Sequence, residues 1–207
     1  MKIILFGDSH TAVFTQPTLA EWMSPEETLM KKNQFYSFRT LPWTCYNINN
    51  NLSYIIEKLK RIDIKKEDYL FFSYGEPDIR CHIGFKNNIN ENIKMVIGRY
   101  VQFLLKIKTI YKNVGVYAPI ASGLNNGLQG NLRKPSFKNS YERNKITILF
   151  NEELKKQCKK NDILFKSIYK ELLNDDNTTK SEYYIDGIHL HLNAFKLLEK
   201  EFSDLLD

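Results

Sequence analysis

Apolar and polar residues along this chain form blocks whose lengths predict strands and helices in turn. The first block, Ile3 to Phe6, is an unbroken apolar run, typical of a central strand buried on both faces. Three later blocks rich in aromatic and β-branched residues also predict strands, at residues 34–41, 68–74 and 114–118. A shorter apolar block at residues 163–165 predicts a fifth strand.

Between these blocks, apolar residues recur at the spacing of an α-helix. The spacing predicts helices over 52–61, 89–107, 146–154 and 194–205, together with a helical turn at 19–23. Strands that alternate with helices imply parallel βαβ units, and so a doubly wound α/β sheet covered on both faces. We expect the loops after the first three strands, and the loop before the last helix, to meet at one edge. Residues 120–140 hold several turn-forming residues and predict a long loop.

Composition adds the expected domain organisation and location. A chain of 207 residues with 43% apolar and 26% charged residues predicts a single globular domain over 1–207. It has no apolar run of membrane-spanning length, so we expect no stable membrane insertion. The N-terminal apolar run ends in GDSH and lacks a small-residue cleavage site. We therefore interpret it as a strand of the fold, and expect a cytoplasmic protein.

Charge and cysteine content exclude further classes. The net charge of +6 comes from 30 basic and 24 acidic residues spread along the chain. Binding of nucleic acid would need a denser basic patch with interleaved aromatic residues, so we expect no nucleic-acid partner. The odd number of cysteines, Cys45, Cys81 and Cys158, argues against a disulfide framework and a structural zinc site.

Polar residues follow the first predicted strand directly, in the sequence Gly7-Asp8-Ser9-His10. Gly7 can adopt backbone angles that other residues avoid, which would let the chain turn sharply as it leaves the sheet. Ser9 would then lie just past the carboxyl end of a strand, where open α/β sheets bind ligands. This makes Ser9 a candidate nucleophile. The alternative is that Asp8 and Ser9 only cap the next segment.

A second polar turn, Asp186-Gly187-Ile188-His189, precedes the last predicted helix. An acid three residues before a histidine can place its carboxylate beside one imidazole nitrogen, leaving the other nitrogen to act as a base toward a serine. Alternatively, Asp186 is a turn residue and His189 starts the helix.

A metal cluster formed by acids and histidines of the chain is a further alternative. The candidate ligands are Asp8, Asp78, Asp186, His82, His189 and His191. Their spacing matches no metal-binding motif, so we expect no metal.

Together, GDSH near the N-terminus and DGIH near the C-terminus resemble the motifs of the SGNH (GDSL-type) hydrolase superfamily, in order and spacing over essentially the whole chain. The resemblance implies a three-layer α/β/α sandwich with a five-stranded parallel, flavodoxin-like sheet. It also implies ester chemistry without a metal or cofactor. By motif position, Ser9 would be the nucleophile, His189 the base, and Asp186 the residue that orients the base.

Two oxyanion-stabilising positions of that superfamily differ here. No glycine occurs between Gly7 and Gly75, although the superfamily usually has one after the second strand. Pro77, which has no N–H donor, occupies the asparagine position of the superfamily's G-x-N-D motif. Because one oxyanion donor is worth about 3 to 4 kcal/mol, an active enzyme should replace them. The backbone near Thr44 and Cys45 is the candidate for the first position.

For the second position, the side chains of Arg80 and His82 are the nearest candidates. Glu76 and Asp78 could hold Arg80 by bidentate pairing. The alternative is that these acids and Arg80 form an ion-pair cluster that only shapes the loop. His10, next to the candidate nucleophile, is a candidate substrate contact or a surface residue. Trp43 and Tyr46 follow the second predicted strand and either stack on a sugar or belong to the core.

These residues predict a serine esterase or O-acyltransferase that works through an acyl-serine intermediate. The expected partner is a glycan or a small molecule that carries an ester, most naturally an O-acetyl group. Two alternatives remain open. One is a non-catalytic glycan-binding module on the same fold, which the altered oxyanion positions favour. The other is a phosphoester-processing enzyme that uses the same pocket.

Overall fold

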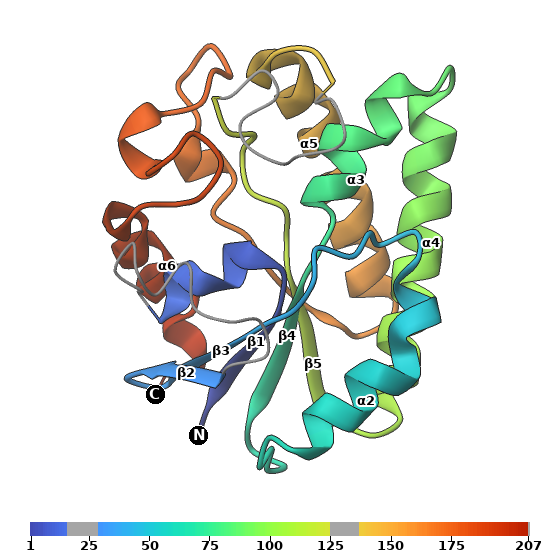
Figure 1. Ribbon diagram of the computed structural model, residues 1–207, viewed down its shortest axis with the longest axis vertical. Coiled ribbons are helices and arrows are strands. Elements are labelled where there is room, and N and C mark those ends of the chain that lie inside the picture. The colour runs from blue at the N-terminus through green and yellow to red at the C-terminus, as the bar shows by residue number, and fades with distance from the viewer. Residues whose placement is uncertain (16–28, 125–136, 207) are drawn as a thin grey trace.

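The computed structural model describes residues 1–15, 29–124 and 137–206, and a six-stranded sheet forms its centre (Figure 1). The strand order is β2-β3-β1-β4-β5-β6. The strands are β1 (Ile3–Gly7), β2 (Leu29–Lys32), β3 (Phe35–Arg39), β4 (Tyr69–Ser73), β5 (Asn113–Tyr117) and β6 (Leu164–Lys166).

The five predicted strands are present and pair in parallel in the order of a flavodoxin-like sheet. The sixth strand, β2, pairs antiparallel with β3 at the edge and was not predicted. Its four residues, LMKK, lie at a sheet edge where none of them is buried. Such a short, solvated strand leaves neither an apolar run nor a clear alternation in the sequence.

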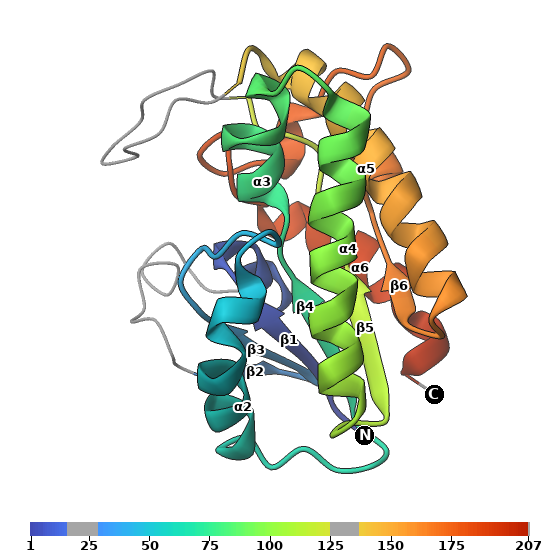
Figure 2. The same ribbon diagram turned by 90° about the vertical axis from the view of Figure 1, so that its right-hand side faces the viewer.

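Helices cover both faces of the sheet, as expected from the alternating pattern (Figures 1 and 2). The α-helices are α2 (Leu52–Lys60), α3 (Glu76–Cys81), α4 (Ile89–Lys108), α5 (Ser140–Lys160) and α6 (Phe195–Glu201). The short 3₁₀ helices are η1 (Ser9–Phe14), η2 (Ile48–Asn51), η3 (Ile83–Phe85), η4 (Lys170–Leu172), η5 (Ser181–Tyr183), η6 (Leu192–Ala194) and η7 (Ser203–Leu205).

Strand β1 contributes side chains to two separate hydrophobic cores, because successive side chains of a strand point to opposite faces of the sheet. Ile4 and Phe6 belong to a cluster with residues of α2, α4 and α5, the helices in front of the sheet in Figure 2. Ile3 and Leu5 belong to a second cluster with residues of η1 and α6 on the opposite face. Every residue of β1 is buried, which fixes the position of the turn that follows it.

Helix α3 replaces the loop that the sequence predicted after the third strand. Gly75 has a left-handed φ of 118°, which turns the chain from β4 into the helix. Pro77 lies in the first turn, where its missing N–H breaks no helical hydrogen bond. Its six residues, EPDIRC, are too few and too polar to show a helical period, so the sequence predicts a loop there.

Some expectations fall outside the described residues. The helical turn predicted at 19–23 lies there, as does most of the loop predicted at 120–140. No helix in the described ranges has both the length and the apolar composition needed to cross a membrane. Cys45, Cys81 and Cys158 form no disulfide among the described residues.

Candidate active site

Gly7 is the last residue of β1, which lies between β3 and β4. Close packing against these strands requires a glycine at this position. A β-carbon on Gly7 would lie 2.3 Å from the carbonyl oxygen of Ser73 in β4. On the other side, the Thr40 amide donates a hydrogen bond of 2.6 Å to the Gly7 carbonyl. The expected unusual backbone angle is absent, because the described glycines with positive φ are Gly75 and Gly187. Gly7 therefore lets two strands approach closely where the site begins.

The turn after β1 caps a short helix and presents Ser9 at its first position. The Asp8 carboxylate accepts a hydrogen bond of 3.0 Å from the His10 amide, so the capping role foreseen for Asp8 is real. Ser9 is the first residue of η1, and the amide of a first helical residue has no partner within the helix. Ser9 thus lies at the carboxyl edge of the sheet, with an amide that the helix itself does not use.

The DGIH turn folds around the carboxylate of Asp186. Its Oδ1 atom accepts hydrogen bonds from the amides of Ile188 (2.9 Å) and His189 (2.8 Å). Gly187 has a left-handed φ of 77°, which favours glycine. An antiparallel bridge between Tyr184 and Leu190 closes the base of the turn. These local contacts define the conformation of the turn that carries His189.

This turn brings a carboxylate, an imidazole and a hydroxyl into one chain of hydrogen bonds. His189 Nδ1 lies 2.6 Å from Asp186 Oδ2, and His189 Nε2 lies 2.9 Å from Ser9 Oγ. Burial raises the pKa of Asp186, but the hydrogen bonds from His189 and the amides outweigh it and hold that pKa well below its usual range. An ionised Asp186 orients the imidazole so that Nε2 can accept the serine proton.

The four segments expected to converge meet around Ser9. They line a cleft of about 390 Å³ formed by the turn after β1, the loop after β3, helix α3 and the DGIH turn. The cleft residues are Asp8, Ser9, His10, Pro42, Glu76, Pro77, Arg80, Asp186, Ile188 and His189. Pro42 and Ile188 were not singled out from the sequence, since an apolar residue beside a polar motif carries no signal of its own.

One wall of the cleft is an ion-pair network centred on Glu76. Arg80 Nε and Nη2 donate to the two Glu76 oxygens at 2.5 and 3.1 Å, which is the bidentate pairing expected for this arginine. His10 Nε2 lies 3.9 Å from the same carboxylate, and the His10 ring lies 5.5 Å from the ring of His189. Glu76 thus lies between the Arg80 guanidinium and the His10 imidazole, close to the hydrogen-bonded chain of Ser9.

His10 is buried in this network and is not a surface residue. Burial alone lowers the pKa of His10, but Asp8 and Glu76 outweigh it and raise that pKa above the usual value. Burial also raises the pKa of Glu76, while His10 and Arg80 outweigh it and lower the pKa to about 2. The network therefore favours an ionised Glu76 and shifts His10 toward its protonated form.

Asp78 does not share in holding Arg80, contrary to expectation. Its carboxylate accepts hydrogen bonds from the amides of Cys45 (2.7 Å) and Tyr46 (3.2 Å). Burial raises the pKa of Asp78 to about 7, although these amides lower it. The Cys45 amide is consequently already used within the protein, so the structure gives it no role as the missing oxyanion donor.

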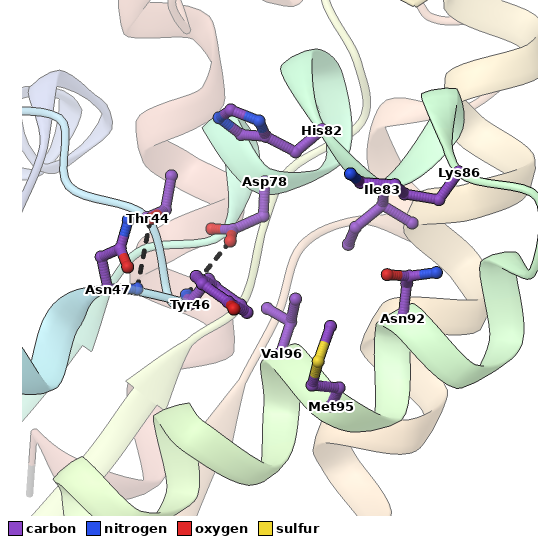
Figure 3. Close-up of a pocket in the computed structure, with 10 residues that line it drawn as sticks. All are labelled: Thr44, Tyr46, Asn47, Asp78, His82, Ile83, Lys86, Asn92, Met95 and Val96. Atoms are coloured by element: carbon purple, nitrogen blue, oxygen red, sulfur yellow. Dashed lines mark hydrogen bonds between the residues drawn. The ribbon is translucent and has the colours of Figure 1, made fainter.

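Thr44 and His82 lie elsewhere as well. Both line a second cavity on the Asp78 side of α3, shown in Figure 3, and neither lines the cleft that holds Ser9. Their predicted part in an oxyanion site is therefore not supported by their positions. His191 caps η6 by accepting a hydrogen bond from the Asn193 amide at 3.2 Å. Within the described residues, no group of three or more acids, histidines or cysteines is arranged to hold a metal ion.

The fold is an α/β/α sandwich, and the Ser–His–Asp chain lies at the carboxyl edge of its sheet. We compared the sequence and the fold with those of known proteins. No protein-family model and no curated protein matches the sequence. A GDSL-like lipase from Bacteroides thetaiotaomicron matches the structure with a TM-score of 0.62 at 15% identity, over 99% of this chain and 87% of that one.

A second solved structure is a catalytic mutant of an acetylxylan esterase from Geobacillus stearothermophilus, in which a serine is replaced by alanine. It matches with a TM-score of 0.60 at 10% identity, over 99% of this chain and 93% of that one. The fold of this chain is therefore that of GDSL-like lipases and acetylxylan esterases.

Proposed function

We propose that this protein is a serine esterase or O-acyltransferase that forms an acyl-serine intermediate. The observation that carries the proposal is the chain of hydrogen bonds from Ser9 through His189 to Asp186, with distances of 2.9 and 2.6 Å. Such a chain lets the imidazole take a proton from a hydroxyl that is otherwise a weak nucleophile.

In the proposed reaction, Ser9 Oγ attacks the ester carbonyl carbon while His189 Nε2 takes the hydroxyl proton. The carbonyl π electrons move to oxygen, and ionised Asp186 stabilises the imidazolium. When the tetrahedral intermediate collapses, the C–O bond to the alcohol breaks and His189 returns the proton to the leaving oxygen. Water or a second alcohol then attacks the acyl-serine by the same steps in reverse.

The oxyanion would be stabilised by two groups of this chain. The first is the Ser9 amide at the start of η1. The second is the guanidinium of Arg80, which lines the same cleft and is held by Glu76 through Nε and Nη2. Its third nitrogen, Nη1, takes no part in that pair. An arginine in this role would supply charge as well as hydrogen bonds where the asparagine is replaced by Pro77.

For the substrate, we propose an ester of a glycan or of a small molecule, with an O-acetyl group as the first candidate. Support comes from the fold shared with an acetylxylan esterase and a GDSL-like lipase.

Covalent labelling tests the proposal directly. Wild-type protein and the variants Ser9→Ala and His189→Ala are treated with a fluorophosphonate, and intact masses are measured over time. We expect one adduct on the wild type, none on Ser9→Ala, and much slower labelling of His189→Ala. A folded wild type that gains no adduct would overturn the proposal.

A second function, a non-catalytic glycan-binding module, has one specific observation in its favour. The Cys45 amide donates to Asp78, and Pro77 has no donor, so two positions that would stabilise an oxyanion are unavailable. This function predicts glycan binding without acyl release and without labelling by fluorophosphonate.

A further inference from the structure

The second cavity has a volume of about 380 Å³, within the usual range for small-molecule sites. Figure 3 shows its walls: the loop after β3 with Thr44, Tyr46 and Asn47, helix α3 with Asp78, the turn around η3, and helix α4. It shares α3 with the cleft of Ser9, but its lining contains none of Ser9, Asp186 and His189. The proposed reaction therefore leaves this cavity unused.

The polar groups of the cavity include a carboxyl, an ammonium group, an imidazole and amides. Asp78 is only 1% exposed, and each of its oxygens accepts one amide hydrogen bond, which leaves acceptor capacity toward the cavity. Lys86 adds an ammonium group, His82 an imidazole, and Asn47 and Asn92 add side-chain amides that both donate and accept. The Asn92 amide nitrogen already donates one hydrogen bond, of 2.7 Å, to the Asn88 carbonyl, which leaves its second N–H and its oxygen for a ligand. With a pKa of about 7, Asp78 is about half protonated at neutral pH, so its carboxyl can both donate and accept a hydrogen bond there. The set suits a neutral ligand with several hydroxyl groups.

The remaining surface of the cavity is apolar and includes an aromatic ring. Ile83 and Val96 are buried, and Met95 extends the apolar surface from α4 (Figure 3). The guanidinium of Arg99 lies 3.8 Å from the centre of the Tyr46 ring and donates to the Tyr46 carbonyl at 3.4 Å. These contacts fix the aromatic ring at the wall. A sugar combines hydroxyl edges with apolar C–H faces, and so matches both kinds of surface.

We propose that this cavity binds one neutral sugar ring, with its hydroxyl groups on Asp78 and Asn92 and its C–H face against Met95, Val96 and Tyr46. The cavity would then hold a carbohydrate unit of the ester on which Ser9 acts, a step that rests on the proposed function. Binding of the sugar itself does not depend on the nucleophile.

The experiment is an NMR titration of the Ser9→Ala protein, which cannot turn the substrate over. Methyl β-xyloside and methyl β-glucoside are the neutral probes, and glucuronate and glucosamine are the charged ones. We expect the neutral glycosides to shift the side-chain amide signals of Asn47 and Asn92, and to bind more tightly than either charged sugar. Asn92→Ala should weaken binding by roughly 5-fold to 10-fold, as expected for one or two lost hydrogen bonds.

Two matched pairs of variants separate the cavity from general effects on α4. Met95→Trp should fill the cavity and abolish binding, whereas Leu105→Trp, at an exposed residue of the same helix outside the cavity, should leave it unchanged. Gln102→Ala is the corresponding control for Asn92→Ala, since Gln102 is exposed on α4 and also lies outside the cavity. Full binding by the Met95→Trp protein would overturn the inference, as would tighter binding of a charged sugar.

Fluorophosphonate labelling of the wild type keeps this test separate from the proposed function. If Ser9 is labelled but no neutral glycoside binds, the inference fails and the esterase proposal stands. If a glycoside binds in the cavity but Ser9 is not labelled, the inference stands and the chain is a binding module.

Discussion

Gly123 packs so closely on Gly187 that a β-carbon added to Gly123 would lie 1.8 Å from the Gly187 carbonyl oxygen. Gly187 belongs to the turn that carries His189, and Gly123 follows β5 on the neighbouring loop. Buried Arg143 fixes that loop by donating a hydrogen bond of 2.9 Å to the Gly123 carbonyl. The loop after β5 is therefore the support on which the turn with His189 rests.

Replacement of Gly123 by alanine should displace the DGIH turn and lengthen the hydrogen bond between His189 and Ser9. We expect fluorophosphonate labelling to slow by roughly 100-fold, since small misplacements of reacting groups are costly. Gly98→Ala is the control, because a β-carbon there meets no atom within 4 Å. Gly98 lies in α4, so that change should stabilise the fold by about 0.5 to 1 kcal/mol and leave labelling unchanged. Labelling of Gly123→Ala at the wild-type rate would show that this contact does not position His189.

The contact between these two glycines could not be predicted from the sequence, whereas the Ser–His–Asp chain could. Ser9, Asp186 and His189 lie on two short motifs that are informative as a pair, and the parallel sheet brings the ends of its strands to one edge. Gly123 carries no local signal, because its role depends on a turn 64 residues further along the chain that packs against it.

The same contrast holds for the rest of the fold. Strands buried on both faces, such as β1 and β4, leave apolar runs in the sequence. Strand β2 leaves none, because it lies at an edge with no buried residue. The hydrogen-bond partners of Asp78 could not be predicted from the sequence either. Its carboxylate accepts from the amides of Cys45 and Tyr46, and does not pair with Arg80, because the fold places the loop after β3 beside it.

Asp186→Asn tests the orientation of the imidazole. An asparagine of the same shape could still accept the amide hydrogen bonds of the turn, but it would not stabilise a protonated His189. We expect turnover to fall by on the order of 1,000-fold to 10,000-fold. The melting temperature should also fall, because the lowered pKa of Asp186 means that its ionised form stabilises the fold, so turnover is compared at a temperature where both proteins are folded. Asp175→Asn, at an exposed acid away from the cleft, should leave turnover unchanged. Near-normal turnover by Asp186→Asn would remove this carboxylate from the mechanism.

Arg80→Ala tests the proposed oxyanion donor. Because Arg80 lines the cleft with Ser9, we expect turnover of the folded protein to fall by roughly 100-fold or more. The change also leaves Glu76 without its bidentate partner and should lower the melting temperature, so turnover is compared at a temperature where both proteins are folded. Arg61 makes an ion pair with Glu57 at the same four-residue spacing on the exposed surface of α2. Arg61→Ala is thus a matched control that should change neither turnover nor stability measurably. Unchanged turnover of the folded Arg80→Ala protein would exclude Arg80 from the mechanism.

Glu76 offers a test in which the dependence on pH is the readout. The folded protein lowers the pKa of this carboxyl from 4.5 to about 2, because His10 and Arg80 outweigh the cost of burial. A lowered pKa means that the ionised group stabilises the fold at pH values above about 4.5. That contribution is lost as the pH falls from about 4.5 toward about 2, where Glu76 becomes protonated in the folded protein.

Glu76→Gln should therefore lower the free energy of unfolding by about 3 kcal/mol at pH 7 and by clearly less at pH 3, as measured by urea denaturation. The same change removes a partner of His10, so the pKa of His10, followed by NMR, should fall relative to the wild type. Glu57→Gln, in the exposed pair with Arg61, should cost less than about 1 kcal/mol at either pH. A Glu76→Gln protein whose loss of stability is the same at pH 7 and pH 3 would show that the carboxylate charge does not hold the network together.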